Sequence, residues 1–103
     1  MDKTKKKMAT VTLEEPIDRG ETQIATLQIR KPQGGELRGL SLAELTMLKT
    51  DTLYELLPRI TMPPITEAEA VALDPADLFA CAIEIAGFFL PAGMMPDALS
   101  KIQ

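Results

Sequence analysis

The chain is 103 residues long, the length of one domain, and it carries a formal net charge of −4 with no histidine and a single cysteine. The negative charge disfavours binding to nucleic acid or to anionic membrane surfaces, and a single cysteine excludes an internal disulfide and is typical of a reducing compartment. Hydrophobic residues make up 46% of the chain, yet it has no tryptophan and few other aromatic residues, so we expect an aliphatic core.

The sequence offers little of the chemistry that enzymes use. Without histidine, the hydroxyls of Ser41 and Ser100 and the thiol of Cys81 have no imidazole base, and no zinc or transition-metal ligand set is present. An acid–base pair of carboxylates in a cleft stays formally possible, but the carboxylates fit capping or helix-dipole roles better. We therefore predict a protein without catalytic residues, cofactors or bound metal. The carboxylates with such structural roles are Glu44, Asp51, Glu69, Asp74 and Asp77.

The two ends of the chain are expected to lie outside the folded domain. Residues 1–8 carry four lysines without interleaved aromatic side chains, which predicts a disordered basic arm and not a nucleic-acid-binding element. No apolar stretch follows this arm, so we expect no secretory signal. The most apolar run, residues 78–90, is too short to cross a membrane. Residues 91–103 are expected to form a C-terminal extension that could include a short helix, which leaves residues 9–90 as a single domain.

Two segments near the start of the chain predict a β-hairpin. Thr10–Leu13 and Gln23–Arg30 alternate polar and apolar side chains, and the turn signal Asp18-Arg19-Gly20 lies between them. Ile24 lies on the face opposite to the other apolar residues of the second segment, which either a bulge or burial of both faces would explain. The residues expected on the inner face of that segment are Ala25, Leu27 and Ile29.

Short helices are predicted after the hairpin. Ser41 and Glu44 form a capping-box pattern, in which each side chain bonds the backbone of the other residue, and Thr66 with Glu69 forms a second one. Gly34-Gly35 indicates the turn that ends the sheet. The sequence around this pair lacks the Gly-Lys-Ser/Thr ending of a phosphate-binding loop.

The second of these helices is expected to be short. Asp51 can cap its start, and Pro58 would remove a helical hydrogen bond, which predicts an end near Leu57. Taken together, the elements predict an α+β fold, in which an N-terminal β-hairpin precedes three to four short helices, the longest over about residues 75–90.

This longest helix has the clearest start in the sequence. Asp74 suits the N-cap, Pro75 the first helical position and Asp77 the acidic first turn. The helix is apolar around most of its circumference, with a narrow polar stripe, and a small domain has few elements to cover it. Complete internal burial and partner contact are both compatible with this pattern, and we favour partner contact. The candidate protein-binding residues are Leu78, Ile85, Phe88, Phe89 and Leu90.

Seven short motifs follow one another between residues 30 and 88, within a match that covers approximately residues 11–90. Their order and spacing resemble the Mu-like phage tail assembly chaperones, a group that includes the tail protein E type. These motifs are Arg30-Lys31-Pro32, Leu37-Arg38-Gly39, Ser41-Leu42, Leu56-Leu57-Pro58-Arg59-Ile60, Pro64-Ile65-Thr66-Glu67, Asp74-Pro75-Ala76-Asp77-Leu78 and Gly87-Phe88.

The resemblance implies a non-catalytic protein in the cytoplasm of the bacterial host. Such a chaperone of a phage or prophage binds the tape measure protein, keeps it soluble during tail morphogenesis and is not expected in the mature virion. Self-association, in a homo-oligomer, is left open, as is a longer frameshifted form. The alternatives are a structural tail or baseplate component of the virion and a small nucleic-acid-binding adaptor. We expect no nucleic acid and no membrane among the partners.

Overall fold

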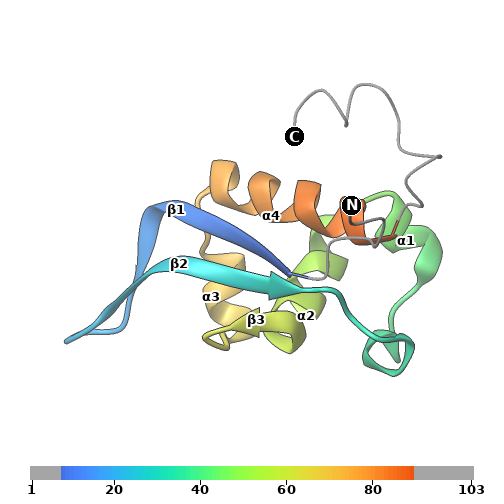
Figure 1. Ribbon diagram of the computed structural model, residues 1–103, viewed down its shortest axis with the longest axis horizontal. Helices are drawn as coiled ribbons and strands as arrows, with labels where there is room; N and C mark the ends of the chain where they lie inside the picture. Colours follow the sequence, from blue (N-terminus) through green and yellow to red (C-terminus); the bar gives the residue numbers. More distant parts are fainter. Residues whose placement is uncertain (1–7, 90–103) are drawn as a thin grey trace, which may run out of the picture.

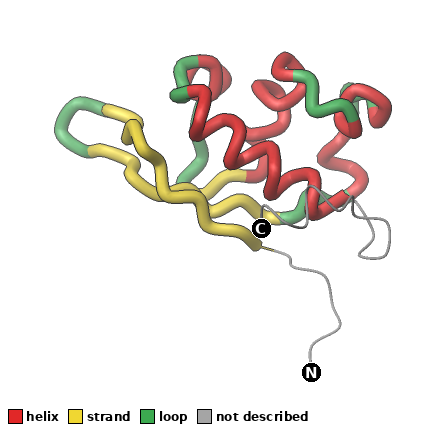
Figure 2. The backbone as a smooth tube through the Cα atoms, turned by 90° about the horizontal axis from the view of Figure 1, so that it is seen from above, coloured by secondary structure: helices red, strands yellow, loops and turns green. Residues whose placement is uncertain are grey.

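The computed structural model describes residues 8–89. A three-stranded antiparallel sheet with the order β1-β2-β3 forms one layer, and the helices pack on one side of it (Figure 1, Figure 2). The predicted α+β class is confirmed. The strands are β1 (Met8–Asp18), β2 (Gln23–Arg30) and β3 (Thr61–Met62), and the helices are η1 (Gly34–Leu37), α1 (Leu42–Thr46), α2 (Thr50–Ile60), α3 (Glu67–Val71) and α4 (Pro75–Phe89).

The hairpin is longer and more irregular than the sequence predicted. β1 extends through Pro16 to Asp18, so the predicted segment Thr10–Leu13 was too short. Thr12 pairs with Thr26 and Ile17 with Ile24, so β1 advances five residues where β2 advances two. A bulge in β1 therefore accounts for Ile24, which is buried together with Leu27 and Ile29. Ala25, predicted on the inner face, is exposed because the alternation along β2 changes at this bulge.

The bulge depends on a carboxylate from a helix far along the chain. Asp77, in the first turn of α4, accepts hydrogen bonds from the backbone N–H groups of Glu14 at 2.8 Å and Glu15 at 3.1 Å. Its exposed fraction is only 1%, so this first-turn carboxylate is buried in the domain and does not face solvent. The bulge breaks the ladder to β2 between Thr12 and Ile17, and the Asp77 carboxylate provides an acceptor for two of the N–H groups in that break.

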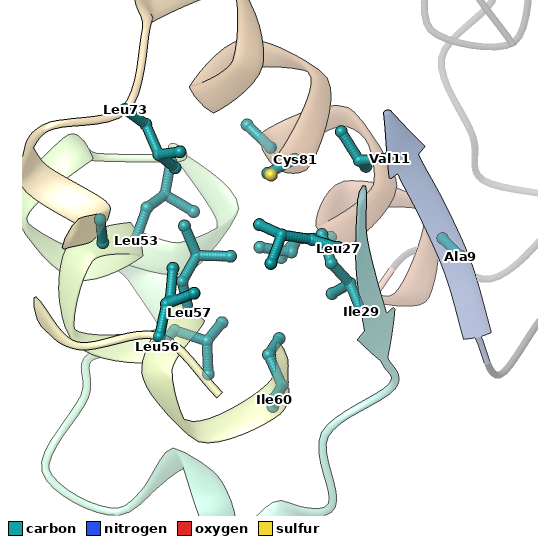
Figure 3. Packing of buried hydrophobic residues seen from close by; sticks show 14 of the residues in the cluster. Ala9, Val11, Leu27, Ile29, Leu53, Leu56, Leu57, Ile60, Leu73 and Cys81 are labelled. Carbon is teal, nitrogen blue, oxygen red and sulfur yellow. The ribbon is translucent and has the colours of Figure 1, made fainter. Parts of the chain in front are cut away.

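The core lies between the sheet and helices α2 and α4. Leu27 and Ile29 of β2 point towards Leu56 and Ile60 of α2, and Cys81 of α4 closes the same layer (Figure 3). These side chains are almost completely buried, and nearly all of them are aliphatic, as the composition predicted. Burial of this kind is the main stabilising contribution in a domain of this size.

The prediction that helix α2 ends near Leu57, before Pro58, was wrong. α2 continues through Pro58 to Ile60, and its N-cap is Lys49, which makes no side-chain capping bond, so Asp51 is a first-turn acid and not the cap. Burial of Ile60, one turn beyond Leu56, offsets the free-energy cost of the hydrogen bond that is lost at Pro58. This is possible because helices in proteins are stabilised mainly by the packing of their apolar face.

The predicted helix starts are confirmed in part. Thr66 and Glu69 form the complete capping box at α3. At α1 the Ser41 hydroxyl accepts from the Glu44 N–H, but the Glu44 carboxylate does not return to Ser41; it accepts from the Thr52 hydroxyl at 3.2 Å instead. At α4 the side chain of Asp74 accepts from the Ala76 N–H at 3.0 Å, and its carbonyl accepts from Leu78, as expected of an N-cap.

Two arginine–glutamate pairs connect the sheet to the helical layer. Arg19, in the hairpin turn, donates two hydrogen bonds to the Glu69 carboxylate at 2.8 and 2.9 Å and a third to the carbonyl of Pro64. Arg30, at the end of β2, pairs in the same bidentate manner with Glu36 of η1. The pKa of each glutamate is lowered to about 2, chiefly by the hydrogen bonds from its arginine.

Several predictions concern residues that the structure does not describe. The basic arm (residues 1–8) lies outside the described residues except for Met8, where β1 begins. Residues 91–103 and the candidate residue Leu90 also lie outside them.

We predict that Asp77→Ala lowers the free energy of unfolding by about 2–4 kcal/mol, because it removes two hydrogen bonds to a charged acceptor. Asp74→Ala serves as the control, since it removes an ordinary N-cap at the same helix start and should cost only about 0.5–2 kcal/mol. Urea unfolding measures both changes. Asp77→Ala should also accelerate hydrogen exchange at the amides of Glu14 and Glu15. An equal or larger loss for Asp74→Ala would contradict the role assigned to Asp77.

Acid should weaken the contact between the hairpin turn and α3. Because the pKa of Glu69 is lowered in the folded protein, its ion pair contributes stability above about pH 4.5, and this stability is lost as the pH falls towards about 2. Glu69→Gln should therefore flatten the fall of the urea midpoint between pH 5 and pH 2.5. Glu67→Gln, at an exposed position of the same helix, should leave that fall unchanged, and equal effects of the two variants would refute the assignment.

Candidate functional site

Helix α4 has two apolar sides with different surroundings. One side packs into the core through Cys81, Ile85 and Phe88, whose exposed fractions are 0%, 0% and 2%. The other side faces the α1–α2 corner, where the helical layer leaves a depression. This second side is the part of the helix that the domain does not cover completely.

The depression consists of two hollows that meet at Leu48. The larger has a volume of about 320 Å³ and the smaller about 30 Å³. We call the two together the α4 groove. Leu48, Thr50, Leu53, Pro75, Leu78, Phe79 and Ala82 line the larger hollow, and Leu45, Thr46, Leu48, Ala86 and Phe89 line the smaller one.

The residues that α4 contributes to the groove form one stripe. They recur every three or four residues, at Pro75, at Leu78 and its neighbour Phe79, at Ala82, at Ala86 and at Phe89, which places them on one side of an α-helix. At 1.5 Å per residue the stripe is about 21 Å long. Apart from the hydroxyls of Thr46 and Thr50, all the lining side chains are apolar, so the groove is suited to an apolar ligand of similar length.

Phe79 is the most exposed aromatic side chain described, and the sequence analysis did not select it. Its exposed fraction is 60%, and it lies at the edge of the larger hollow. It lies four residues after Pro75 and three before Ala82, and this spacing was the signal that could have separated it from the buried face. Hydrophobicity alone does not distinguish this side of the helix from the side that faces the core.

Leu48 has an unusual backbone conformation at the centre of the groove. Its φ is 56°, in the left-handed region that glycine usually occupies at the end of a helix. The N–H of Leu48 donates to the carbonyl of Leu45 and that of Lys49 to the carbonyl of Glu44, which is the pattern that closes such helix ends. A leucine here costs about 1–2 kcal/mol relative to an unstrained conformation. The conformation directs the chain from α1 into α2 and leaves the Leu48 side chain between the two hollows.

The structure separates the predicted binding residues into two groups. Leu78 and Phe89 are partly exposed and line the groove, so they stay candidates for partner contact. Ile85 and Phe88 are buried against the core. On their side of α4, the structure therefore shows complete internal burial, which was the alternative to partner contact. Leu90 lies outside the described residues.

The potentially reactive side chains of residues 8–89 lie in surroundings that are typical of structural residues. Burial raises the pKa of the Cys81 thiol to about 12, which keeps it protonated, as expected for a small core side chain. Between residues 8 and 89 there is no group of three histidine, cysteine, aspartate or glutamate residues that could hold a metal ion. A search of the same residues finds no helix of the length and apolarity needed to span a bilayer.

A separate hollow, away from the α4 groove and between the end of β1 and α3, has three carboxylates among its lining residues. It has a volume of about 280 Å³, with Glu15, Asp18 and Glu69 at its margin. Glu69 is held by Arg19, and Asp18 accepts from the N–H of Gly20 at 2.9 Å. Two of the three carboxylates therefore already have structural hydrogen-bond partners, which makes this hollow a poor acid–base site.

Comparison with known proteins assigns the chain to a family. The family model for phage tail assembly chaperone proteins, described as E, or 41 or 14, matches residues 10–90. This range includes all but the first two of the described residues. The chain therefore belongs to the phage tail assembly chaperones, which confirms the resemblance seen in its motifs.

Two proteins of Escherichia phage P2 are similar to the chain. Tail assembly protein E is 43% identical over 81 residues, which cover 79% of this chain and 89% of the P2 protein. Tail assembly protein E′ is 42% identical over 80 residues, and here the match covers 78% of this chain but only 56% of the longer P2 protein. No solved structure matches the chain.

Alanine variants are usually more stable than glycine variants at the same position. We expect the opposite order at position 48, because the backbone of Leu48 is strained. Leu48→Gly should be more stable than Leu48→Ala by about 1 kcal/mol, because glycine relieves the left-handed conformation while both variants lose the leucine side chain. Urea unfolding of the two variants measures the difference.

The neighbouring residue provides the control for this prediction. Met47 is exposed and has a right-handed conformation with φ −86°, so Met47→Ala should be the more stable of its alanine and glycine variants. If alanine were also the better residue at position 48, Leu48 would not be strained.

Proposed function

We propose that this protein binds apolar helical segments of the tape measure protein and keeps them soluble until the tail is assembled. It does so as a non-catalytic chaperone in the cytoplasm of the bacterial host, and it is absent from the mature virion. Membership of the tail assembly chaperone family supports the process, and the α4 groove supports the mode of binding.

The α4 groove is the observation that carries this proposal. It is an apolar surface made of two hollows of about 320 and 30 Å³ that follow α4 for about 21 Å, and it is lined partly by side chains that the domain leaves accessible to water. Phe79 is more than half exposed, and Leu48 lies between the hollows in spite of its strained backbone.

The dimensions of the groove favour a helix as the ligand. Its length corresponds to about four helical turns, and amphipathic helices are commonly recognised by burial of their apolar stripe in a groove of this kind. Burial of such a stripe removes from water the surface through which unassembled helices aggregate. Binding in the groove therefore accounts for a solubilising activity without any chemical step.

We predict that Phe79→Ser weakens capture of the tape measure protein about tenfold, because it removes a large apolar side chain from the groove and costs roughly 1–2 kcal/mol of binding free energy. The measurement is the amount of soluble tape measure protein that co-purifies with the chaperone after co-expression. Urea unfolding should show little change, since Phe79 is mostly exposed.

Met62→Ser is the matched control for this experiment. Met62 is a large apolar residue with an exposed fraction of 61%, close to the value for Phe79, but it lies in β3 and does not line the groove. Equal capture by wild type and Phe79→Ser, or an equal loss with Met62→Ser, would refute the groove as the binding site. Detection of the protein in fixed ratio in purified phage particles would instead favour a structural tail component.

A further inference from the structure

The described part of the chain is much more acidic than the whole. Residues 8–89 contain thirteen aspartate and glutamate residues against six lysine and arginine residues, whereas the complete chain has a net charge of only −4. The difference arises because four of the eleven basic residues lie in residues 1–7 and one in residues 90–103. The folded body that forms the groove therefore has a strongly negative field.

Most of the basic residues of this body are held by its own acceptors. Arg19 and Arg30 pair with glutamates, and Lys49 lies 3.5 Å from Glu44. Arg59 donates to the backbone carbonyls of Glu36 and Arg38. These positive charges are thus oriented by internal contacts, and the excess of negative charge is left to act on a ligand.

Acidic residues also lie next to the groove in the chain. Asp51 follows the lining residue Thr50, and Asp74 precedes the lining residue Pro75, so α2 and α4 each have an acidic residue next in the chain to a residue of the larger hollow. Glu55 lies one turn further along α2. Asp51 and Glu55 are exposed, and neither forms an ion pair with another described residue.

This charge distribution distinguishes between the possible occupants of the groove. Residues 8–89 of a second copy would carry the same negative charge, so the two bodies would repel each other. Residues 90–103 of the chain contain one aspartate and one lysine, so charge gives them no advantage. A helix with lysine and arginine beside its apolar stripe would be attracted at long range by the negative charge of the body.

We infer that the α4 groove binds a basic amphipathic helix, one whose apolar stripe is flanked by lysine and arginine. This inference rests on the proposed function and adds the chemistry of the partner. The apolar lining provides most of the affinity, and the acidic surroundings select the partner and accelerate its association. Acidic and neutral helices with the same apolar stripe are bound more weakly.

The test uses two synthetic peptides of about 18 residues with the same leucine and alanine stripe, one flanked by lysine and the other by glutamate. The full-length protein should bind the lysine peptide at least about tenfold more tightly at 50 mM salt, measured by fluorescence anisotropy. At 500 mM salt the Debye length falls to about 4 Å, and the preference should shrink to about two- to threefold.

Variants connect the preference to the groove. Asp51→Asn with Glu55→Gln should reduce the preference for the lysine peptide several-fold. Glu15→Gln with Glu21→Gln changes the net charge equally in the hairpin and should reduce it less. Phe79→Ser should weaken binding of both peptides.

The peptide measurements test the charge inference and the proposed binding site separately. Equal affinities for both peptides, or tighter binding of the glutamate peptide, would overturn the charge inference and leave the groove as the binding site. If neither peptide bound, or if Phe79→Ser had no effect on either, the proposed site would fail as well.

The two other possible occupants of the groove are a second copy of the chain and residues 90–103, and each would give a different experimental result. Concentration-dependent dimers that disappear with Phe79→Ser would identify a second copy in the groove. Tighter peptide binding by Met94→Ser with Met95→Ser would identify the C-terminal residues of the chain as the competitor. Either result would overturn the inference.

Discussion

The Asp77 carboxylate makes the contact on which the arrangement of the domain depends. It joins the first turn of α4 to the bulge of β1 through two backbone N–H groups more than sixty residues away in the chain. Since side chains four, eight and eleven residues later share its side of the helix, the orientation of Asp77 also directs Cys81, Ile85 and Phe88 into the core. The stripe that begins at Pro75 must then face the α1–α2 corner. One buried polar contact therefore fixes both the core side of α4 and the groove side.

The groove contains two features that folding alone does not favour. Leu48 occupies a conformation in which glycine would be more stable, and Phe79 exposes a large aromatic surface to water. Both features lie on the larger hollow, although one comes from the α1–α2 corner and the other from α4. Departures from local preference that converge on one surface are typical of binding sites, because the stability lost there is compensated by the remaining core.

Local signals in the sequence predicted many elements well, and contacts between distant residues explain the errors. The capping box at Thr66 and the N-cap at Asp74 depend only on neighbouring residues, so they could be predicted. The bulge of β1 depends on Asp77, and the passage of α2 through Pro58 depends on burial of Ile60. Neither partner can be identified from a local pattern. β3 has only two residues, and its pairing with β2 is likewise a long-range contact.

The same limit applies to the candidate site. Periodicity identified α4 as a helix with more apolar surface than one core requires, and the groove that we propose as the binding site lies along this helix. It could not divide that surface, because the division depends on the side on which Asp77 meets the sheet. Leu78 and Phe89 lie on the groove, while Ile85 and Phe88 lie in the core, and the four residues are equivalent in hydrophobicity alone.

The shallowness of the groove suits the proposed function. A hollow of about 320 Å³ with a few large side chains limits the apolar area that one helix can bury, so the complex should dissociate readily. The negative field of the body acts mainly on association, because long-range attraction raises the rate of encounter more than it prolongs the complex. A chaperone that must release its client to a growing assembly needs this combination of fast capture and fast release. A deep, fully apolar pocket would retain the client and oppose assembly.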